Sequence, residues 1–413
     1  MSQKNIPLII LLILLIFVSG CWDYNEYENL AQVVGIAVDF DNKSRQTTLT
    51  DQYLISSGSK VSANSGSGPS SGKSGMIYSA TDKTLYDAVL DIQQVVMKKL
   101  FYGYLKVFIL GEEAARYNLV DQSELMDRTP LIRDTAYFLV CSGKAEKVLS
   151  TADENNMMTS SEFIADLLKN SKATGAAFPV TIHDVTEMLA IGGLEVTIPR
   201  VISTAQDSGK SETVGSLDNI RIDERYKGAL RVSGMAAFKG DKFAGWLNEK
   251  ETMGFGWITG KNMTAYKVSA EPTGTDPSEI LYFHIIKSGS KMKVKLVDGE
   301  PDISVTVSAT ADLRKYYSQM GSDYLAPGEV KMMEQVLADS IRSDIQAALT
   351  RGQGELQSDI FGFGFAFFRK YPGLWKSEYV KIWPAIYPDI PVHVTVKTTV
   401  INTGANIRKL IIK

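Results

Sequence analysis

Residues 33–40 read VVGIAVDF, and this run of β-branched and small apolar residues predicts a buried strand. A second strand is predicted at 47–55. Residues 85–100 then place apolar side chains three or four positions apart, which indicates a helix with one apolar face. Strand-like runs follow at 104–110 and 135–140, with short helical segments between them. This alternation of strands and helices predicts an α/β layer domain.

The later part of the chain is patterned differently, with strands grouped before one long helix. Residues 230–238 and 242–247 flank a Lys-Gly-Asp sequence, which is a hairpin signal. Val392, Val394 and Val396 alternate with polar residues near the end, which predicts a half-buried antiparallel strand. Between these segments we predict three strands and one amphipathic helix, at 281–287, 291–297, 303–313 and 329–350.

We therefore predict a multidomain chain of mixed α/β and α+β class with three domains. An N-terminal α/β layer domain spans 21–205 and contains a flexible Gly/Ser-rich loop at 56–75. A small central unit containing the β-hairpin spans 206–262. A C-terminal α+β domain, in which the long amphipathic helix accompanies an antiparallel sheet, spans 263–413.

Residues 1–20 have the pattern of a leader. Lys4 precedes an apolar run at 6–18, and thirteen helical residues reach only about 20 Å, short of a hydrocarbon core of ~30 Å. Such a run is typical of a signal peptide. Val18-Ser19-Gly20-Cys21 follows and resembles a lipobox, the signal after which bacterial lipoproteins are cleaved and diacylated on cysteine. We predict a diacylglycerol on Cys21; the alternatives are an incidental cysteine behind an ordinary signal peptide and an uncleaved anchor.

The composition excludes several protein classes. The 413 residues include 44 Lys plus Arg and 47 Asp plus Glu, for a net charge of −3, which argues against a general nucleic-acid binder. Two cysteines and three widely separated histidines supply neither a disulfide scaffold nor the ligand spacing of a metal site. Cys141 lies beside an apolar run and is predicted to be a buried structural residue, with a reactive thiol as the alternative.

Sequence patterns typical of enzymes are not found. Residues 254–261 end in Gly-Lys but lack the glycine spacing and the Ser or Thr of a phosphate-binding loop. No serine nucleophile elbow occurs outside low-complexity sequence, and no carboxylate pair is placed by spacing alone. We predict that the chain is not an enzyme and uses no metal or cofactor beyond the covalent lipid on Cys21.

Residues 359–384 concentrate aromatic side chains and contain two of the five tryptophans. Large aromatic residues are favoured in cores and in interfaces alike. Two interpretations stay open: a local core between the long helix and the final strand, and a docking surface for a partner. The residues concerned are Asp359, Gly362, Phe363, Gly364, Arg369, Pro372, Trp375 and Trp383.

Several of these segments, taken in order, resemble the Ger(x)C family of spore germination lipoproteins, the GerAC-like C subunits of nutrient germinant receptors. The most specific of them is DIFGFG at 359–364. The chain departs from the family at 24–27, where an acidic-hydrophobic pair is common. The other segments that carry the resemblance are Cys21-Trp22-Asp23, the strand 33–39, Leu105-Lys106-Val107, Arg133-Asp134 and 234–252.

The resemblance implies a non-catalytic subunit held by its lipid on the outer face of the inner spore membrane. It implies action with two integral membrane subunits, A and B, in a complex that triggers germination. It also implies a three-domain α/β structure. The alternative function is a solute-binding lipoprotein that captures a small nutrient itself. Such proteins usually have two similar α/β lobes, whereas the two halves of this chain are patterned differently.

Overall fold

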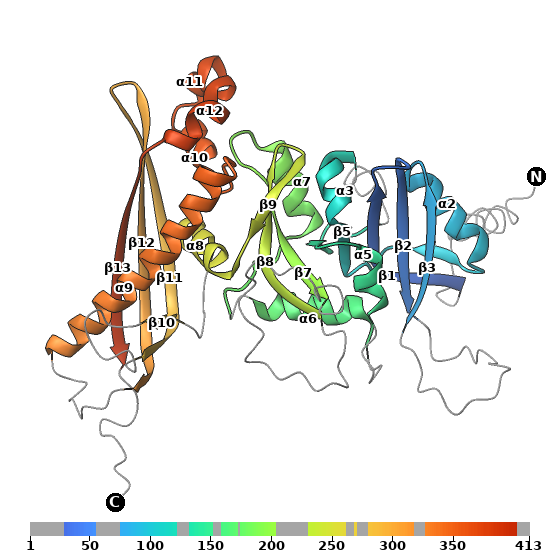
Figure 1. Ribbon diagram of the computed structural model, residues 1–413, viewed down its shortest axis with the longest axis horizontal. Helices are drawn as coiled ribbons and strands as arrows, with labels where there is room; N and C mark the ends of the chain where they lie inside the picture. The colour runs from blue at the N-terminus through green and yellow to red at the C-terminus, as the bar shows by residue number, and fades with distance from the viewer. Residues whose placement is uncertain are drawn as a thin grey trace, which may run out of the picture.

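The computed structural model describes residues 29–54, 75–121, 132–151, 158–171, 174–203, 230–261, 268–270, 280–317 and 327–402. Cys21, the leader and most of the predicted Gly/Ser-rich loop lie outside these residues. Within them, two sheets stand side by side, one of nine strands and one of four (Figure 1). No helix in the described part of the chain combines the length and the apolar character needed to cross a membrane.

The nine-stranded sheet has a parallel centre with antiparallel strands on both sides. Its order is β3-β2-β1-β5-β6-β7-β8-β9, and β4 pairs with β1 off this path. β1, β5, β6 and β7 run parallel to one another. The strands are β1 (Leu30–Asp41), β2 (Gln46–Leu54), β3 (Gly75–Asp82), β4 (Lys99–Phe101), β5 (Val107–Gly111), β6 (Tyr137–Cys141), β7 (Thr197–Ser203), β8 (Leu230–Lys239) and β9 (Lys242–Leu247).

Helices connect the parallel strands, as the predicted α/β layer requires. β1 is buried along almost its whole length, because helices cover both faces of a parallel sheet centre. Cys141, at the end of β6, is buried, as predicted. The helices of this part are α2 (Leu85–Val95), α3 (Glu112–Tyr117), α5 (Ala145–Ser150), α6 (Ser160–Ser171) and α7 (Ile182–Ala190). The mixed α/β fold class is confirmed.

The predicted central hairpin is present, but it belongs to the large sheet. β8 and β9 turn at Gly240, whose φ of +62° suits a glycine. β8 also pairs antiparallel with β7, so the hairpin continues the N-terminal sheet. The described strands of the predicted central unit, β8 and β9, therefore share a sheet with those of the N-terminal unit, because an edge strand offers unpaired backbone groups to the next hairpin.

The second sheet has the order β10-β11-β12-β13 and differs from the prediction in two respects. The strands predicted at 281–287 and 291–297 form one continuous strand, β11, which passes through register shifts near residues 282 and 286. β13 runs parallel to β12, so the prediction of a fully antiparallel sheet is wrong. The strands are β10 (Val268–Ala270), β11 (Ile280–Val297), β12 (Glu300–Tyr317) and β13 (Val392–Asn402).

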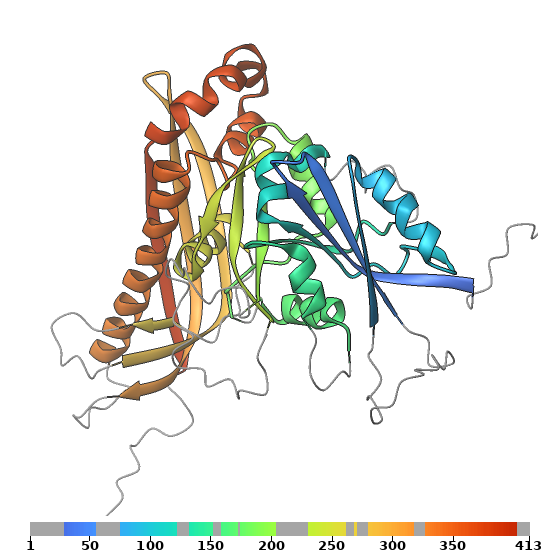
Figure 2. The same cartoon turned by 45° about the vertical axis from the view of Figure 1, so that its right-hand side comes forward.

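The long helix α9 (Pro327–Leu349) lies along one face of this sheet (Figure 2). It buries a stripe of side chains at helical spacing, and each fully buried side chain of this size contributes about 1.5–3 kcal/mol. The stripe consists of Met333, Leu337, Ile341, Ile345 and Leu349. α8 (Glu249–Thr259) packs against α9, and one continuous hydrophobic cluster runs through both sheets.

The chain from α9 to β13 folds into short helices at one end of the small sheet (Figure 1). They are η5 (Thr350–Glu355), α10 (Phe363–Lys370), α11 (Pro372–Leu374), η6 (Trp375–Tyr379), α12 (Val380–Ile386) and η7 (Tyr387–Asp389). This crossover explains the direction of β13, because a parallel neighbour requires a long connection, usually helical.

Candidate functional site

Asp359 is the centre of the aromatic segment. Its carboxylate is buried and accepts three hydrogen bonds. The amide of Phe363 donates to Oδ1 at 2.9 Å and the amide of Gly364 to Oδ2 at 2.7 Å, so Asp359 satisfies the first amides of α10. The indole nitrogen of Trp383 donates to Oδ2 at 2.9 Å. One carboxylate therefore joins the start of α10 to α12.

The electrostatics of Asp359 are dominated by burial. Burial raises the pKa of this carboxyl to about 6, and the three donated hydrogen bonds oppose that rise by favouring the charged form. Glu195 lies near enough to raise the pKa slightly further by charge repulsion. All three hydrogen-bond partners are donors, and such surroundings suit the ionised carboxylate, which only accepts hydrogen bonds.

Glycines allow this segment to press against the large sheet domain. Gly362 has a φ of +72°, which glycine adopts without strain. A Cβ on Gly364 would lie 2.7 Å from the Trp383 indole nitrogen and 2.9 Å from the Cα of Gly193. The amide of Phe365 donates to the carbonyl of Gly193 at 2.7 Å. The start of α10 thus docks on the loop that follows α7.

The aromatic side chains form a compact cluster behind this contact. The Phe367 ring lies 4.5 Å from Tyr379 and 5.6 Å from Trp383, and Trp375 lies 5.4 Å from Trp383, centroid to centroid. All four of these residues are buried. We call Asp359, Gly362, Phe363, Gly364, Trp375 and Trp383 the junction cluster.

The two remaining residues of the predicted set lie at the surface. Arg369 and Pro372 are exposed, on α10 and at the start of α11. Arg369 stands 5.9 Å from the centroid of the Phe365 ring. The structure therefore brings six predicted residues together in the interior and leaves two accessible to another molecule.

Sequence reasoning missed the other side of the junction. Glu195 donates its amide to the Asp359 carbonyl at 3.1 Å, and its carboxylate accepts from the amide of Gly240 at 2.7 Å. Ser358 donates its hydroxyl to the carbonyl of Phe238 at 2.5 Å. In the sequence, the glycine pair at 192–193 was the available signal for this contact, but the segment that it meets lies about 170 residues later.

A second buried aspartate repeats the arrangement in the large sheet. Asp39 ends the VVGIAVD run and accepts from the amides of Ala145 and Glu146 at 2.7 and 2.9 Å, at the start of α5. Burial raises its pKa and these hydrogen bonds lower it. A Cβ on Gly111 would lie 2.1 Å from its Oδ1, so the neighbouring strand needs glycine there. Both aspartates hold helix starts against a sheet.

The other residues considered for chemistry, which are the histidines, Cys141 and the glycines near 254–261, lie in surroundings that suit structural roles. Within the described ranges, no three His, Cys, Asp or Glu side chains gather as they would around a metal ion. His393 contacts Asp302 at 2.8 Å on the exposed face of the small sheet. Burial raises the pKa of the Cys141 thiol well above its ordinary value, which disfavours the reactive thiolate. Gly254 and Gly260 belong to α8 and its C-terminal cap, respectively.

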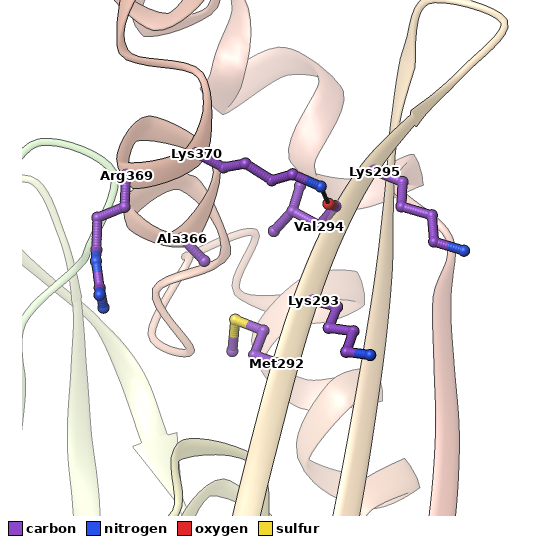
Figure 3. A pocket seen from close by; sticks show the side chains of 7 residues that line it. All are labelled: Met292, Lys293, Val294, Lys295, Ala366, Arg369 and Lys370. Carbon is purple, nitrogen blue, oxygen red and sulfur yellow. Dashed lines mark hydrogen bonds between the residues drawn. The ribbon is translucent and has the colours of Figure 1, made fainter.

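A groove lies between the edge of the small sheet and α10. It has a volume of about 450 Å³. Figure 3 shows Ala366 and Lys370 on the α10 side, and Met292 and Val294 on the β11 side. The exposed Arg369 also lines it, as do Lys293 and Lys295 of β11. The part of the segment that lines this groove is therefore basic, unlike the buried part.

Two models of spore germination protein domains match the chain. "Spore germination protein N-terminal domain" matches residues 23–203, and "Spore germination B3/ GerAC like, C-terminal" matches residues 233–404. Spore germination protein KC of Bacillus subtilis (strain 168) is 24% identical over 410 residues, which cover 98% of this chain and 97% of that protein. Spore germination protein B3 of the same organism is 24% identical over 406 residues, covering 96% and 97%.

A solved structure shares the fold. It is described as the crystal structure of the GerBC protein, and it matches 89% of this chain and 97% of its own with a TM-score of 0.53 and 20% identity. The junction cluster lies inside the C-terminal family domain, and its contact loop lies inside the N-terminal one. Since the two family domains together extend from residue 23 to residue 404 with one short gap, the chain belongs to the Ger(x)C family of spore germination proteins.

Proposed function

We propose that this protein is a non-catalytic, lipid-anchored subunit of a spore nutrient germinant receptor. It acts with integral membrane A and B subunits on the outer face of the inner spore membrane, and the complex triggers germination. The observation that carries the proposal is the extent of the family match, which includes both domains and nearly the full length of relatives named as spore germination proteins.

The anchor is assigned to Cys21. The lipobox-like sequence Val18-Ser19-Gly20-Cys21 precedes the first family domain by two residues. Two acyl chains give stable membrane attachment, whereas one chain would be marginal. Attachment confines the folded domains to the membrane surface and raises their effective concentration for weak contacts with the A and B subunits.

A non-catalytic role agrees with the surroundings of the chemically capable side chains. The buried Asp39 and Asp359 hold helix starts, and the Cys141 thiol is buried with a raised pKa. The family is one of spore germination proteins. We propose that the chain works through binding, and that its only covalent chemistry is lipidation.

The anchor and the partnership are tested together in spores that carry Cys21→Ala. We expect the variant to be lost from the inner membrane fraction, to stop co-purifying with the A and B subunits, and to slow nutrient-triggered germination. Cys141→Ala is the matched control, because it removes the other cysteine and touches no lipid site. Membrane retention and normal germination of the Cys21→Ala spores would contradict the proposal.

The alternative of direct nutrient capture is separated by a binding experiment. The purified full chain is heated with amino acids and sugars at millimolar concentration, and its melting temperature is followed. A ligand that binds only the folded state raises that temperature in proportion to its saturation. We expect no shift; a saturable shift with one nutrient would favour the solute-binding function.

A further inference from the structure

One edge of the small sheet has open hydrogen-bonding positions. β11 pairs with β12 along its length, but among the described residues β10 covers its other edge only at 281–283. Ile303 donates its amide to Pro391 on the β13 side, so it turns away from Val294, its register partner in β11. Peptide groups alternate along a strand, so the amides and carbonyls of Met292, Val294 and Leu296 point outward from the described sheet.

One of these outward-facing groups, the carbonyl of Val294, is occupied by a lysine side chain. Lys370 donates its ammonium group to the carbonyl of Val294 at 2.6 Å (Figure 3). A lysine amine on a four-carbon stem can be exchanged for another donor at little cost. The opposite edge differs, because the amide of Val400 on β13 donates to the Glu334 carboxylate of α9.

The groove beside this edge has the dimensions and charge for an extended segment. The stretch from Met292 to Leu296 spans about 17 Å at 3.4 Å per residue. A register shift near residue 286 and the turn at 298–299 bound it. Of the residues that the structure describes, four cationic side chains and no carboxylate line the groove, the cations being Lys293, Lys295, Arg369 and Lys370.

The cations are placed on two sides of the edge. Lys293 and Lys295 point to one side of β11, away from Met292 and Val294 (Figure 3). Arg369 and Lys370 come from α10, across the groove. Side chains of an added strand would alternate between these two sides, so carboxylates on either of its faces would meet a cation.

We propose that the β11 edge from Met292 to Leu296 is a docking site for an extended acidic segment of a partner protein, which adds to the small sheet as a further strand. Main-chain hydrogen bonds supply the pairing, and the four cations select acidic sequences. Lys370 leaves the Val294 carbonyl and pairs with a carboxylate of the incoming segment. The proposal does not rest on the germination role, because the binding is a property of the chain alone.

The test uses the full chain and a fluorescent seven-residue peptide that alternates glutamate and valine. A peptide with lysine in place of glutamate is the charge control, and anisotropy reports binding. We expect the acidic peptide to bind and the lysine peptide to bind at least about tenfold more weakly. Failure of the acidic peptide to bind, or equal binding of the two, would overturn the proposal.

Two variants locate the site. Arg369→Glu should weaken binding of the acidic peptide by about tenfold or more. Lys376→Glu is its matched control, since Lys376 is exposed on η6 and does not line the groove, and it should change the affinity less than about twofold. Both positions are exposed, so the fold is preserved in each. Equal effects of the two variants would show non-specific attraction and overturn the proposal.

Amide exchange tests the strand pairing itself. In the free chain, the amides of Met292, Val294 and Leu296 should exchange rapidly, while those of Lys293 and Lys295 are protected by β12. Bound acidic peptide should slow exchange at the first three positions by about tenfold or more and leave the other two unchanged. Binding without this alternating protection would show that the peptide adheres by charge only, and the pairing would be excluded.

Discussion

Trp383 donates its indole N–H to the carboxylate of Asp359 at 2.9 Å, across 24 residues of sequence. The same oxygen accepts the amide of Gly364 at 2.7 Å. The buried Asp359 carboxylate therefore links the start of α10 to α12, and this link fixes how α10 meets the loop at Gly193. The aromatic rings supply the buried apolar area of the cluster, while the directional hydrogen bonds to Asp359 fix the orientation of α10 relative to Trp383.

Trp383→Phe should destabilise the chain more than Trp375→Phe. Both changes replace a buried indole by a smaller aromatic ring, but only Trp383 donates to Asp359. A hydrogen bond to a charged group contributes about 1.5–3 kcal/mol. We expect a difference of that size in the free energy of unfolding, measured by urea titration followed by circular dichroism. Equal losses in the two variants would mean that packing alone holds the cluster.

Asp51 makes the stability of the large sheet depend on pH. It is fully buried on β2, where Tyr102 and Tyr53 donate to its Oδ2 at 2.9 and 3.5 Å. Its Oδ1 has no hydrogen-bond partner among the described residues. Burial raises the pKa of Asp51 to about 7, and the two hydroxyl donors oppose that rise. Between about pH 4 and pH 7, Asp51 is therefore protonated in the folded chain and ionised in the unfolded chain.

The free energy of unfolding should fall as the pH rises from about 4 to about 7, because in this range only the folded state binds the proton. Asp51→Asn removes the titration and should flatten this slope. Asp359 and Asp344 have raised pKa values of about 6 and 7, so part of the slope remains in the variant. Urea titrations at several pH values measure it. A slope unchanged by Asp51→Asn would contradict the assignment.

The sequence predicts most elements of this fold but few of their partners. The run at 33–40 is found as the buried strand β1, and the helix predicted at 85–100 is found over Leu85–Val95. Its predicted end is wrong, because Lys99 and Leu100 belong to the short strand β4. The alternation of Val392, Val394 and Val396 correctly indicates a half-buried strand. It carries no information on strand direction, which the helices between α9 and β13 decide.

The sequence likewise reveals one part of the candidate site and hides the other. DIFGFG and the two tryptophans are recognisable as a group, since their types and spacing are unusual. Their contact with Gly193 and Glu195 is not, because contacts between distant segments leave no periodic signal in one sequence. The edge of β11 is hidden for a different reason: the sequence predicts the strand as two pieces, and the continuous edge exists only in the assembled sheet.

Gly364→Ala should disrupt the junction between the two sheets, whereas Gly373→Ala should be tolerated. A Cβ on Gly364 would lie 2.7 Å from the Trp383 nitrogen and 2.9 Å from the Cα of Gly193, while a Cβ on Gly373 would have no described atom within 4 Å. Overpacking of this kind typically costs about 1–3 kcal/mol. Gly193 has a φ of +82°, so the loop it belongs to has little freedom to yield.

Both variants are measured by thermal unfolding and by limited proteolysis between the two sheets. Gly364→Ala should lower the melting temperature and speed cleavage between β9 and β11, where the chain passes from one sheet to the other, because a weakened junction lets the two sheets separate more often. The free energy of unfolding of Gly373→Ala should lie within about 0.5 kcal/mol of the wild-type value. If Gly364→Ala left both readings unchanged, α10 would not be pressed against Gly193, and the junction would have to be held by the shared hydrophobic cluster alone.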